Sequence, residues 1–91
     1  MEIIKKFKIK NDLGLHARTA AMIVELGNQY NSRLYLKKGD CEVDGGSILS
    51  ILTLSCPKGT ELMARIVGED CEDFMERLSQ LIENRFGEET E

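Results

Sequence analysis

The chain has 91 residues, of which 42% are hydrophobic and 31% charged, and its net charge is −4. This length allows one small domain and excludes a second domain or a deep, enclosed pocket. No window approaches the ~18 apolar residues that a membrane-spanning helix needs. The first residues alternate and carry charge, unlike a signal peptide, so the sequence predicts a cytoplasmic globular protein with no membrane association.

The charge is unevenly distributed along the chain. Residues 1–38 contain eight Lys or Arg against three Asp or Glu, whereas residues 39–91 contain four against thirteen. An acidic chain with few aromatic residues and no tryptophan is a poor candidate for binding nucleic acid. The basic segment instead suits a phosphate group or an acidic partner protein.

The three cysteines, Cys41, Cys56 and Cys71, are widely spaced, and none belongs to a CxxC pair. With a single histidine, the chain offers no zinc-ligand pattern, and we expect no metal site. Reduced thiols that pack as small hydrophobic side chains are the interpretation that these positions favour.

The first half of the chain contains two clear periodicities. Alternation of apolar and polar residues predicts a strand over residues 2–9, closed by turn-forming residues at 11–14. Apolar residues at helical spacing then predict a helix over residues 17–27. A second alternating segment, residues 33–37, leads into a hairpin turn at residues 38–40.

The second half begins with the returning strand of that hairpin, at residues 41–43. A short helix is predicted over residues 47–53, with part of its apolar face buried and part exposed. A last strand is predicted over residues 61–67, and an amphipathic helix follows from residue 71. Residues 87–91 are predicted to form a frayed, flexible acidic tail.

The predicted order is therefore β-α-β-β-α-β-α. Four amphipathic strands with helices on one face form a two-layer α+β sandwich. One domain over residues 1–86 accounts for all of these elements.

His16, the only histidine, stands where the first helix begins. A surface or capping histidine is one interpretation, but three features favour a functional one. Gly14 permits a tight backbone bend, the helix N-terminus attracts an anion, and Arg18 supplies donors for phosphate oxygens. Because the same field disfavours a positive imidazolium, we expect a neutral, nucleophilic ring.

The sequence fixes no carboxylate beside His16, and a chain of this size forms no closed cleft. Hydrolysis or group transfer onto small substrates is therefore not expected. A histidine that is itself phosphorylated, and then dephosphorylated by partner proteins, fits the pattern better.

Residues 44–49, Asp-Gly-Gly-Ser-Ile-Leu, allow two interpretations. A strand-to-helix turn with Ser47 as the N-cap explains them without any function. Alternatively, Ser47 is a regulatory serine beside an exposed apolar patch. A phosphate there would place about two negative charges on a docking surface.

Two segments of the chain resemble a known family. Residues 13–20, Leu-Gly-Leu-His-Ala-Arg-Thr-Ala, closely resemble the active-site signature of the histidine-containing phosphocarrier protein family, HPr, of the bacterial phosphoenolpyruvate-dependent phosphotransferase system. Residues 43–54 resemble the regulatory-serine segment of that family, and residues 57–62 the turn that follows it. The resemblance covers nearly the whole chain.

The resemblance implies a phosphocarrier, a covalent relay intermediate that is not an independent enzyme and needs no cofactor. His16 would accept a phosphoryl group on Nδ1 from phosphorylated enzyme I and pass it to an enzyme IIA domain. Arg18 would bind the phosphate, together with the backbone of Ala17 and Arg18. The fold would be an open-faced β-sandwich, with an antiparallel sheet in the order 1-4-2-3 and three helices on one face.

The resemblance also implies where other proteins act. Ser47 would be the site of an ATP-dependent HPr kinase/phosphorylase in organisms that have one. Partners would dock on the start of the first helix and on the short helix, through Thr19, Ala20, Ile48, Leu49, Ile51 and Leu52. The family usually has proline at the position of Thr19, and we expect threonine to give this turn a backbone N–H and some freedom.

The sequence leaves an alternative from another class. The chain could be a regulatory binding module whose phosphorylation state switches its affinity for a transcription factor, a kinase or a metabolic enzyme. A monomer is expected in either case.

Overall fold

Four strands form one antiparallel sheet in the computed structural model, which describes residues 1–88. The strands are β1 (Glu2–Lys8), β2 (Arg33–Lys38), β3 (Cys41–Asp44) and β4 (Glu61–Val67). They lie in the order β1-β4-β2-β3, so each of the two central strands pairs on both of its sides. This order confirms the topology that the resemblance implied.

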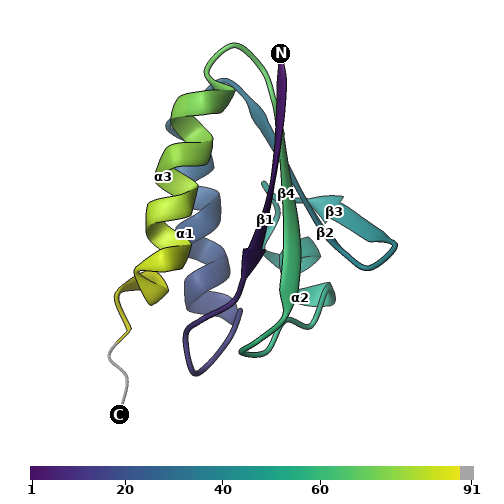
Figure 1. Ribbon diagram of the computed structural model, residues 1–91, viewed down its shortest axis with the longest axis vertical. Coiled ribbons are helices and arrows are strands. Elements are labelled where there is room, and N and C mark those ends of the chain that lie inside the picture. The colour runs from purple at the N-terminus through teal and green to yellow at the C-terminus, as the bar shows by residue number, and fades with distance from the viewer. Residues whose placement is uncertain (89–91) are drawn as a thin grey trace.

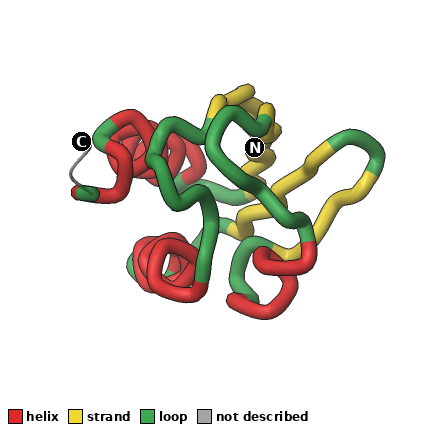
Figure 2. The backbone as a smooth tube through the Cα atoms, turned by 90° about the horizontal axis from the view of Figure 1, so that it is seen from below, coloured by secondary structure: helices red, strands yellow, loops and turns green. Residues whose placement is uncertain are grey.

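Three α-helices cover one face of the sheet and leave the other face open (Figures 1 and 2). They are α1 (Ala17–Gly27), α2 (Ile48–Thr53) and α3 (Cys71–Glu83), and a single 3-10 turn, η1 (Arg85–Gly87), follows α3. The two-layer α+β sandwich predicted from the periodicities is therefore confirmed.

The core lies between the sheet and the helices because the apolar residues of each element share one face. The strands contribute alternate side chains to it, and each helix contributes one stripe. The fully buried large side chains include Leu36, Leu62, Ile66, Ile23, Ile51, Phe74, Leu78 and Ile82. Cys56 and Cys71 are buried free thiols within this core, as expected of small hydrophobic side chains, whereas Cys41 is exposed.

The open face of the sheet carries charged and amphipathic side chains. The guanidinium of Arg65 lies 4.3 Å from the ring centre of Tyr35 and pairs with Glu42 at 2.9 Å. These contacts let a half-covered sheet keep one face in water.

Most element boundaries agree with the sequence predictions, and the differences are small. β1 ends at Lys8, one residue before the predicted end, although Ile9 remains buried and its N–H donates to the Thr60 carbonyl at 2.9 Å. The turn η1 was not predicted. It forms because Phe86, which is only 2% exposed, folds back into the core after α3 has ended.

Helices α1 and α3 run in opposite directions across the sheet (Figure 1). The start of α1 and the end of α3 consequently lie at the same end of the molecule. An ion pair between Lys10, before α1, and Glu83, at the end of α3, joins the two segments there. This arrangement brings the C-terminal segment to the residues around His16.

Within residues 1–88, no helix has the length and apolar character needed to cross a membrane.

Candidate functional site

The loop before α1 is held against the segment that leads to β4. Gly14 has a φ of +69°, and a Cβ atom there would lie 2.4 Å from the carbonyl oxygen of Cys56. The N–H of the next residue, Leu15, donates to that same carbonyl at 2.8 Å. Only glycine combines this left-handed backbone with so close an approach, so Gly14 fixes where His16 enters the helix.

His16 is the N-cap residue of α1, as the sequence predicted, and its backbone is extended. Its carbonyl oxygen accepts the first helical hydrogen bond, from Ala20, at 2.8 Å. The backbone N–H groups of Ala17 and Arg18 belong to the first turn, where helical N–H groups lack a partner within the helix. The side chain of His16 is 31% exposed, so a partner protein can reach the ring at this helix end.

Thr19 forms hydrogen bonds that tie the first turn of α1 to the residues before it. Its side chain is fully buried, and its Oγ1 accepts the N–H of His16 at 2.9 Å. The Thr19 hydroxyl can also donate to the carbonyl of His16 at 3.2 Å, or to that of Gly14 at 3.4 Å. A side chain at the third helical position that bonds back to the N-cap is one half of a capping box, which stabilises the helix start.

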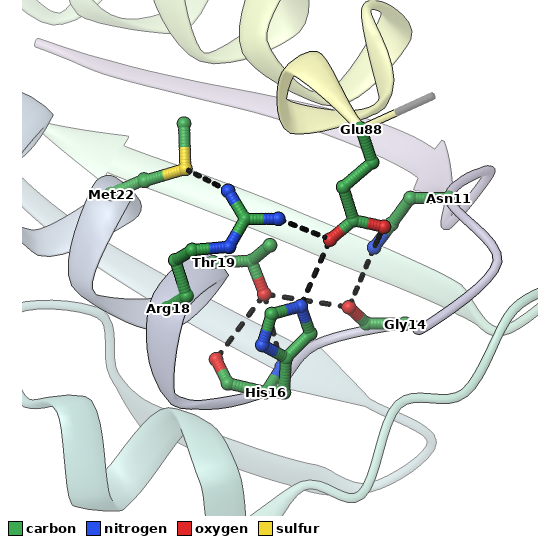
Figure 3. Close-up of polar contacts among 7 residues, drawn as sticks. All are labelled: Asn11, Gly14, His16, Arg18, Thr19, Met22 and Glu88. Carbon is green, nitrogen blue, oxygen red and sulfur yellow. Dashed lines mark hydrogen bonds and ion pairs between the residues drawn. The ribbon is translucent and has the colours of Figure 1, made fainter. Parts of the chain in front are cut away.

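A carboxylate lies beside His16, and the sequence did not predict it. Oε2 of Glu88 is 2.9 Å from Nε2 of His16 and 2.9 Å from Nη2 of Arg18 (Figure 3). The contact joins residues 72 positions apart in the chain. Sequence reasoning placed no carboxylate beside the histidine, because it considered only neighbours in sequence.

Asn11 is the other member of the site that sequence reasoning missed. It is fully buried, and its Nδ2 donates to the Gly14 carbonyl at 2.7 Å and to Oε1 of Glu88 at 3.1 Å. Its Oδ1 is buried without a hydrogen-bond partner among the residues that the structure describes. The sequence had assigned Asn11 to a turn, and a buried turn amide is not distinguishable from an exposed one by pattern alone.

The contacts with His16, Arg18 and Asn11 cover most of the Glu88 side chain. Its side chain is 8% exposed. The hydrogen bond with His16 lowers the pKa of this carboxyl group, and the bond from Asn11 and the charge of Arg18 lower it further, whereas burial acts in the opposite direction. Glu88 is therefore ionised at neutral pH and can only accept hydrogen bonds.

The turn η1 positions Glu88 beside His16. Arg85 and Phe86 have φ values of 54° and 56°, a left-handed backbone that costs about 1–2 kcal/mol per residue outside glycine. Burial of the Phe86 ring contributes about 1.5–3 kcal/mol in return. Gly87 belongs to this turn and Glu88 follows it, so the predicted tail does not begin at residue 87. The remaining residues of the predicted tail, 89–91, lie outside the described part of the chain.

The two ring nitrogens of His16 have different surroundings. Nε2 faces Glu88, and Nδ1 lies on the other side of the ring, without a hydrogen bond to another side chain within residues 1–88 (Figure 3). The backbone N–H of Thr19 faces the His16 side chain and completes the capping box. Arg18 is 56% exposed, and besides Glu88 it contacts the sulfur of Met22 at 3.8 Å. A nucleophilic nitrogen, a guanidinium and a helix N-terminus are thus gathered at one accessible point of the surface. Such a set can accept a phosphoryl group.

The predicted docking residues divide into exposed and buried ones. Leu49 is 77% exposed and Ile48 is 37% exposed, and Leu52 is half-buried. The side chains of Thr19, Ala20 and Ile51 are fully buried, so they support the fold and are not available to a partner in this conformation. Leu13 is 70% exposed three positions before His16, and sequence reasoning did not single it out for docking.

Ser47 caps α2, as predicted. Its Oγ accepts the N–H of Ser50 at 3.2 Å, and the residue is half-buried. α2 packs against α1, and its Ile51 side chain lies in the core. The cap interpretation of Ser47 is therefore confirmed, and it is compatible with modification of the hydroxyl.

The structure offers no obvious metal ligands in the part that it describes. Among residues 1–88, no three His, Cys, Asp or Glu side chains are gathered closely enough to hold a metal ion.

Comparisons with known proteins agree with the geometry of this site. The protein family described as the PTS HPr component phosphorylation site matches residues 3–84. A phosphocarrier protein HPr of Xylella fastidiosa is 40% identical over 82 residues, which cover 90% of this chain and 92% of that protein.

Solved structures of the same kind of protein share the fold. An HPr from Thermoanaerobacter tengcongensis superposes with a TM-score of 0.92 at 34% identity, covering 97% of this chain and 99% of that one. An HPr dimer from the same organism superposes with a TM-score of 0.76 at 35% identity, covering 90% and 94% of the two chains. The expectation of a monomer stays a prediction beside this dimeric relative.

Proposed function

The chain belongs to the HPr family of the bacterial phosphotransferase system, and we propose that it relays a phosphoryl group through His16. The group would arrive from phosphorylated enzyme I and leave to an enzyme IIA domain. The observation that carries this proposal is the partly exposed ring of His16 at the N-terminus of α1, close to Arg18. We expect the relay to operate in the cytoplasm.

The chemistry that this site contributes is modest. Nδ1 of His16 would attack the phosphorus, and the free N–H groups of Ala17 and Arg18 would bind the phosphoryl oxygens at the helix N-terminus. The Arg18 guanidinium, which is largely exposed, can turn towards those oxygens. The partners supply the rest of the positioning, so the protein would be a covalent intermediate and not a catalyst with its own turnover.

Partners would dock on the exposed apolar residues near this end of the molecule. Ile48 and Leu49 on α2, with Leu13 before the histidine, supply apolar side chains that a partner can cover. Exposed apolar side chains near polar groups are typical of protein-binding surfaces.

Ser47 supports a regulatory extension of the same proposal. A phosphate on its hydroxyl would sit at the N-cap of α2, next to Ile48 and Leu49. The added charge would weaken docking of an acidic or apolar partner without refolding the helix. A switch of this kind could also serve regulators in place of the relay. Partners captured by the Ser47→Asp variant, compared with those captured by the unmodified protein, would distinguish these two uses.

The proposed function is tested by incubating the protein with phosphoenolpyruvate and enzyme I. We expect an acid-labile phosphate that appears on the wild-type protein and is absent from the His16→Ala variant. A His16→Ala variant that still takes up the label would show that another residue is the acceptor.

The docking surface has a matched test. We expect Leu49→Lys to weaken phosphoryl uptake from enzyme I by roughly tenfold, because an exposed apolar contact is replaced by a charge. Ile4→Lys is the control, since Ile4 is 53% exposed on the open face of the sheet. Equal uptake by the two variants would remove α2 from the docking surface.

A further inference from the structure

We propose that Glu88 is a positioning residue for the phosphoryl acceptor: its carboxylate holds the proton on Nε2 of His16 and leaves the lone pair on Nδ1. This role rests on the proposed function, because it matters for phosphoryl transfer only if His16 is the acceptor. Its geometric part, the choice of tautomer, stands without any phosphoryl donor.

The argument begins with the hydrogen-bonding capacity of the two groups. Oε2 of Glu88 lies 2.9 Å from Nε2 of His16, which is the distance of a normal hydrogen bond. An ionised carboxylate has no proton to give, so Nε2 must be the donor. A neutral imidazole carries one proton only, and Nδ1 is then the nitrogen with the free electron pair.

The carboxylate is held in place from three directions. Asn11 donates to Oε1 at 3.1 Å, while Arg18 and His16 both contact Oε2 at 2.9 Å. The side chain that makes these contacts is 8% exposed. Asn11 is itself fully buried and tied to the Gly14 carbonyl at 2.7 Å, so the orientation of the carboxylate is built into the loop before α1.

The electrostatics agree with this geometry. The bond with His16 is the largest influence that lowers the pKa of Glu88, and the neighbouring Asn11 and Arg18 add to it. A group that stays ionised next to the ring can orient it in every state that the relay passes through.

The transfer step balances with the proton in this position. The lone pair of Nδ1 forms a bond to phosphorus, while the bond between phosphorus and the donor breaks and its electron pair leaves on the donor group. The proton on Nε2 stays where it is. The ring therefore gains positive charge as the new bond forms, and the adjacent carboxylate stabilises that charge.

A different role for Glu88 predicts the opposite behaviour. If the carboxylate only occupied the place of the phosphoryl oxygens, it would have to leave before transfer, and its removal would speed phosphorylation. The contacts favour positioning, because Glu88 lies at Nε2, whereas the accepting nitrogen is Nδ1 on the other side of the ring (Figure 3).

The tautomer can be measured directly by long-range ¹H–¹⁵N NMR of His16, above the pH at which the ring becomes neutral. In the wild-type protein we expect a proton-bearing Nε2, with slow exchange of its proton, and an unprotonated Nδ1. In Glu88→Gln and Glu88→Ala we expect faster exchange of that proton and the appearance of the other tautomer. Unchanged nitrogen shifts and exchange rates in both variants would overturn the proposal.

The rate of phosphorylation by phosphorylated enzyme I is the second readout. We expect Glu88→Gln to lower it roughly tenfold, as loss of an orienting partner commonly does. Glu76→Gln is the control, since Glu76 is exposed in the middle of α3. If Glu88→Gln is phosphorylated faster than the wild-type protein, Glu88 occupies the place of the phosphoryl oxygens and does not position the ring.

The two proposals fail in different ways. If wild-type protein is never phosphorylated at His16, the proposed relay is wrong, whereas the NMR spectra still show whether Glu88 selects the tautomer. If wild-type protein is phosphorylated and the variants match it in both rate and spectrum, only the role of Glu88 is wrong.

Discussion

Among single residues, Glu88 accounts for the largest difference between the site predicted from the sequence and the site in the structure. The basic segment around His16 suggested an open anion site, and the structure already places one carboxylate there, against His16 and Arg18. The ring of His16 thus lies between the N-terminus of α1 and a negatively charged carboxylate.

The lowered pKa of Glu88 gives a prediction about stability and pH. A carboxyl group whose pKa is lower in the folded than in the unfolded state stabilises the fold above its ordinary pKa of about 4.3, and this contribution disappears as the pH falls through the lowered value. We expect wild-type protein to be more stable than Glu88→Gln at pH 7. The difference should disappear as the pH falls through the lowered pKa of Glu88, because the carboxyl group is then protonated.

Chemical denaturation of both proteins, at pH 7 and at successively lower pH, measures the difference in their free energies of unfolding. The groups that face the carboxylate are His16, Arg18 and Asn11, and Glu76→Gln again serves as the control in the middle of α3. A difference in stability between wild type and Glu88→Gln that stays constant as the pH is lowered would show that ionised Glu88 does not stabilise the fold.

Among the elements, the loop before α1 depends most on one residue. Gly14 and Gly39 both have left-handed backbones, with φ values of 69° and 59°, but only Gly14 has backbone atoms against it. We expect Gly39→Ala to cost about 1 kcal/mol of stability, which is the cost of the backbone conformation alone. Gly14→Ala should cost about 3 kcal/mol or more, because its Cβ would meet the Cys56 carbonyl at 2.4 Å.

Thermal or chemical denaturation of the two alanine variants separates these contributions. Because Gly14 fixes the entry of the chain into α1, its variant should also lose phosphoryl uptake, whereas the Gly39 variant should keep it. Equal stability losses at the two positions would mean that the close approach at Gly14 is relieved by a small shift of the loop.

The elements themselves were largely predictable from the sequence. β4 and α1 have the predicted bounds, because a period of two or of 3.6 residues is a local property of the chain. The predicted Ser47 cap is present for the same reason, since a cap is read from adjacent residues. The turn η1 was not predictable in this way, because two left-handed residues form there only when Phe86 can enter a core built by distant segments.

The site, too, combines residues that local patterns predict with residues that only the folded chain brings together. His16, Gly14 and Arg18 are neighbours in sequence, and their arrangement follows from a bend and the first turn of a helix. Glu88 comes from 72 positions away, and local patterns carry no information about such a contact. A signal was nevertheless present: Phe86 is an apolar residue just before the predicted tail, and an apolar residue there favours a segment that packs back onto the fold.

For the whole molecule, the fold joins the two oppositely charged halves of the chain at one end. Antiparallel packing of α1 and α3 places the end of the acidic half against the basic segment that contains the histidine (Figure 1). Lys10 and Glu83 form one link between these halves, and Glu88 with Arg18 forms another. Glu88 is therefore part of the site, although the sequence assigned it to a solvated tail.

The central claim is that this molecule carries a phosphoryl group on one particular nitrogen of one histidine. The most direct measurement is ¹⁵N and ³¹P NMR of the protein after incubation with phosphoenolpyruvate and a catalytic amount of enzyme I. We predict a phosphoryl group bonded to Nδ1 of His16, with the proton retained on Nε2. A phosphoryl group on Nε2, or a His16 spectrum that does not change, would contradict the account.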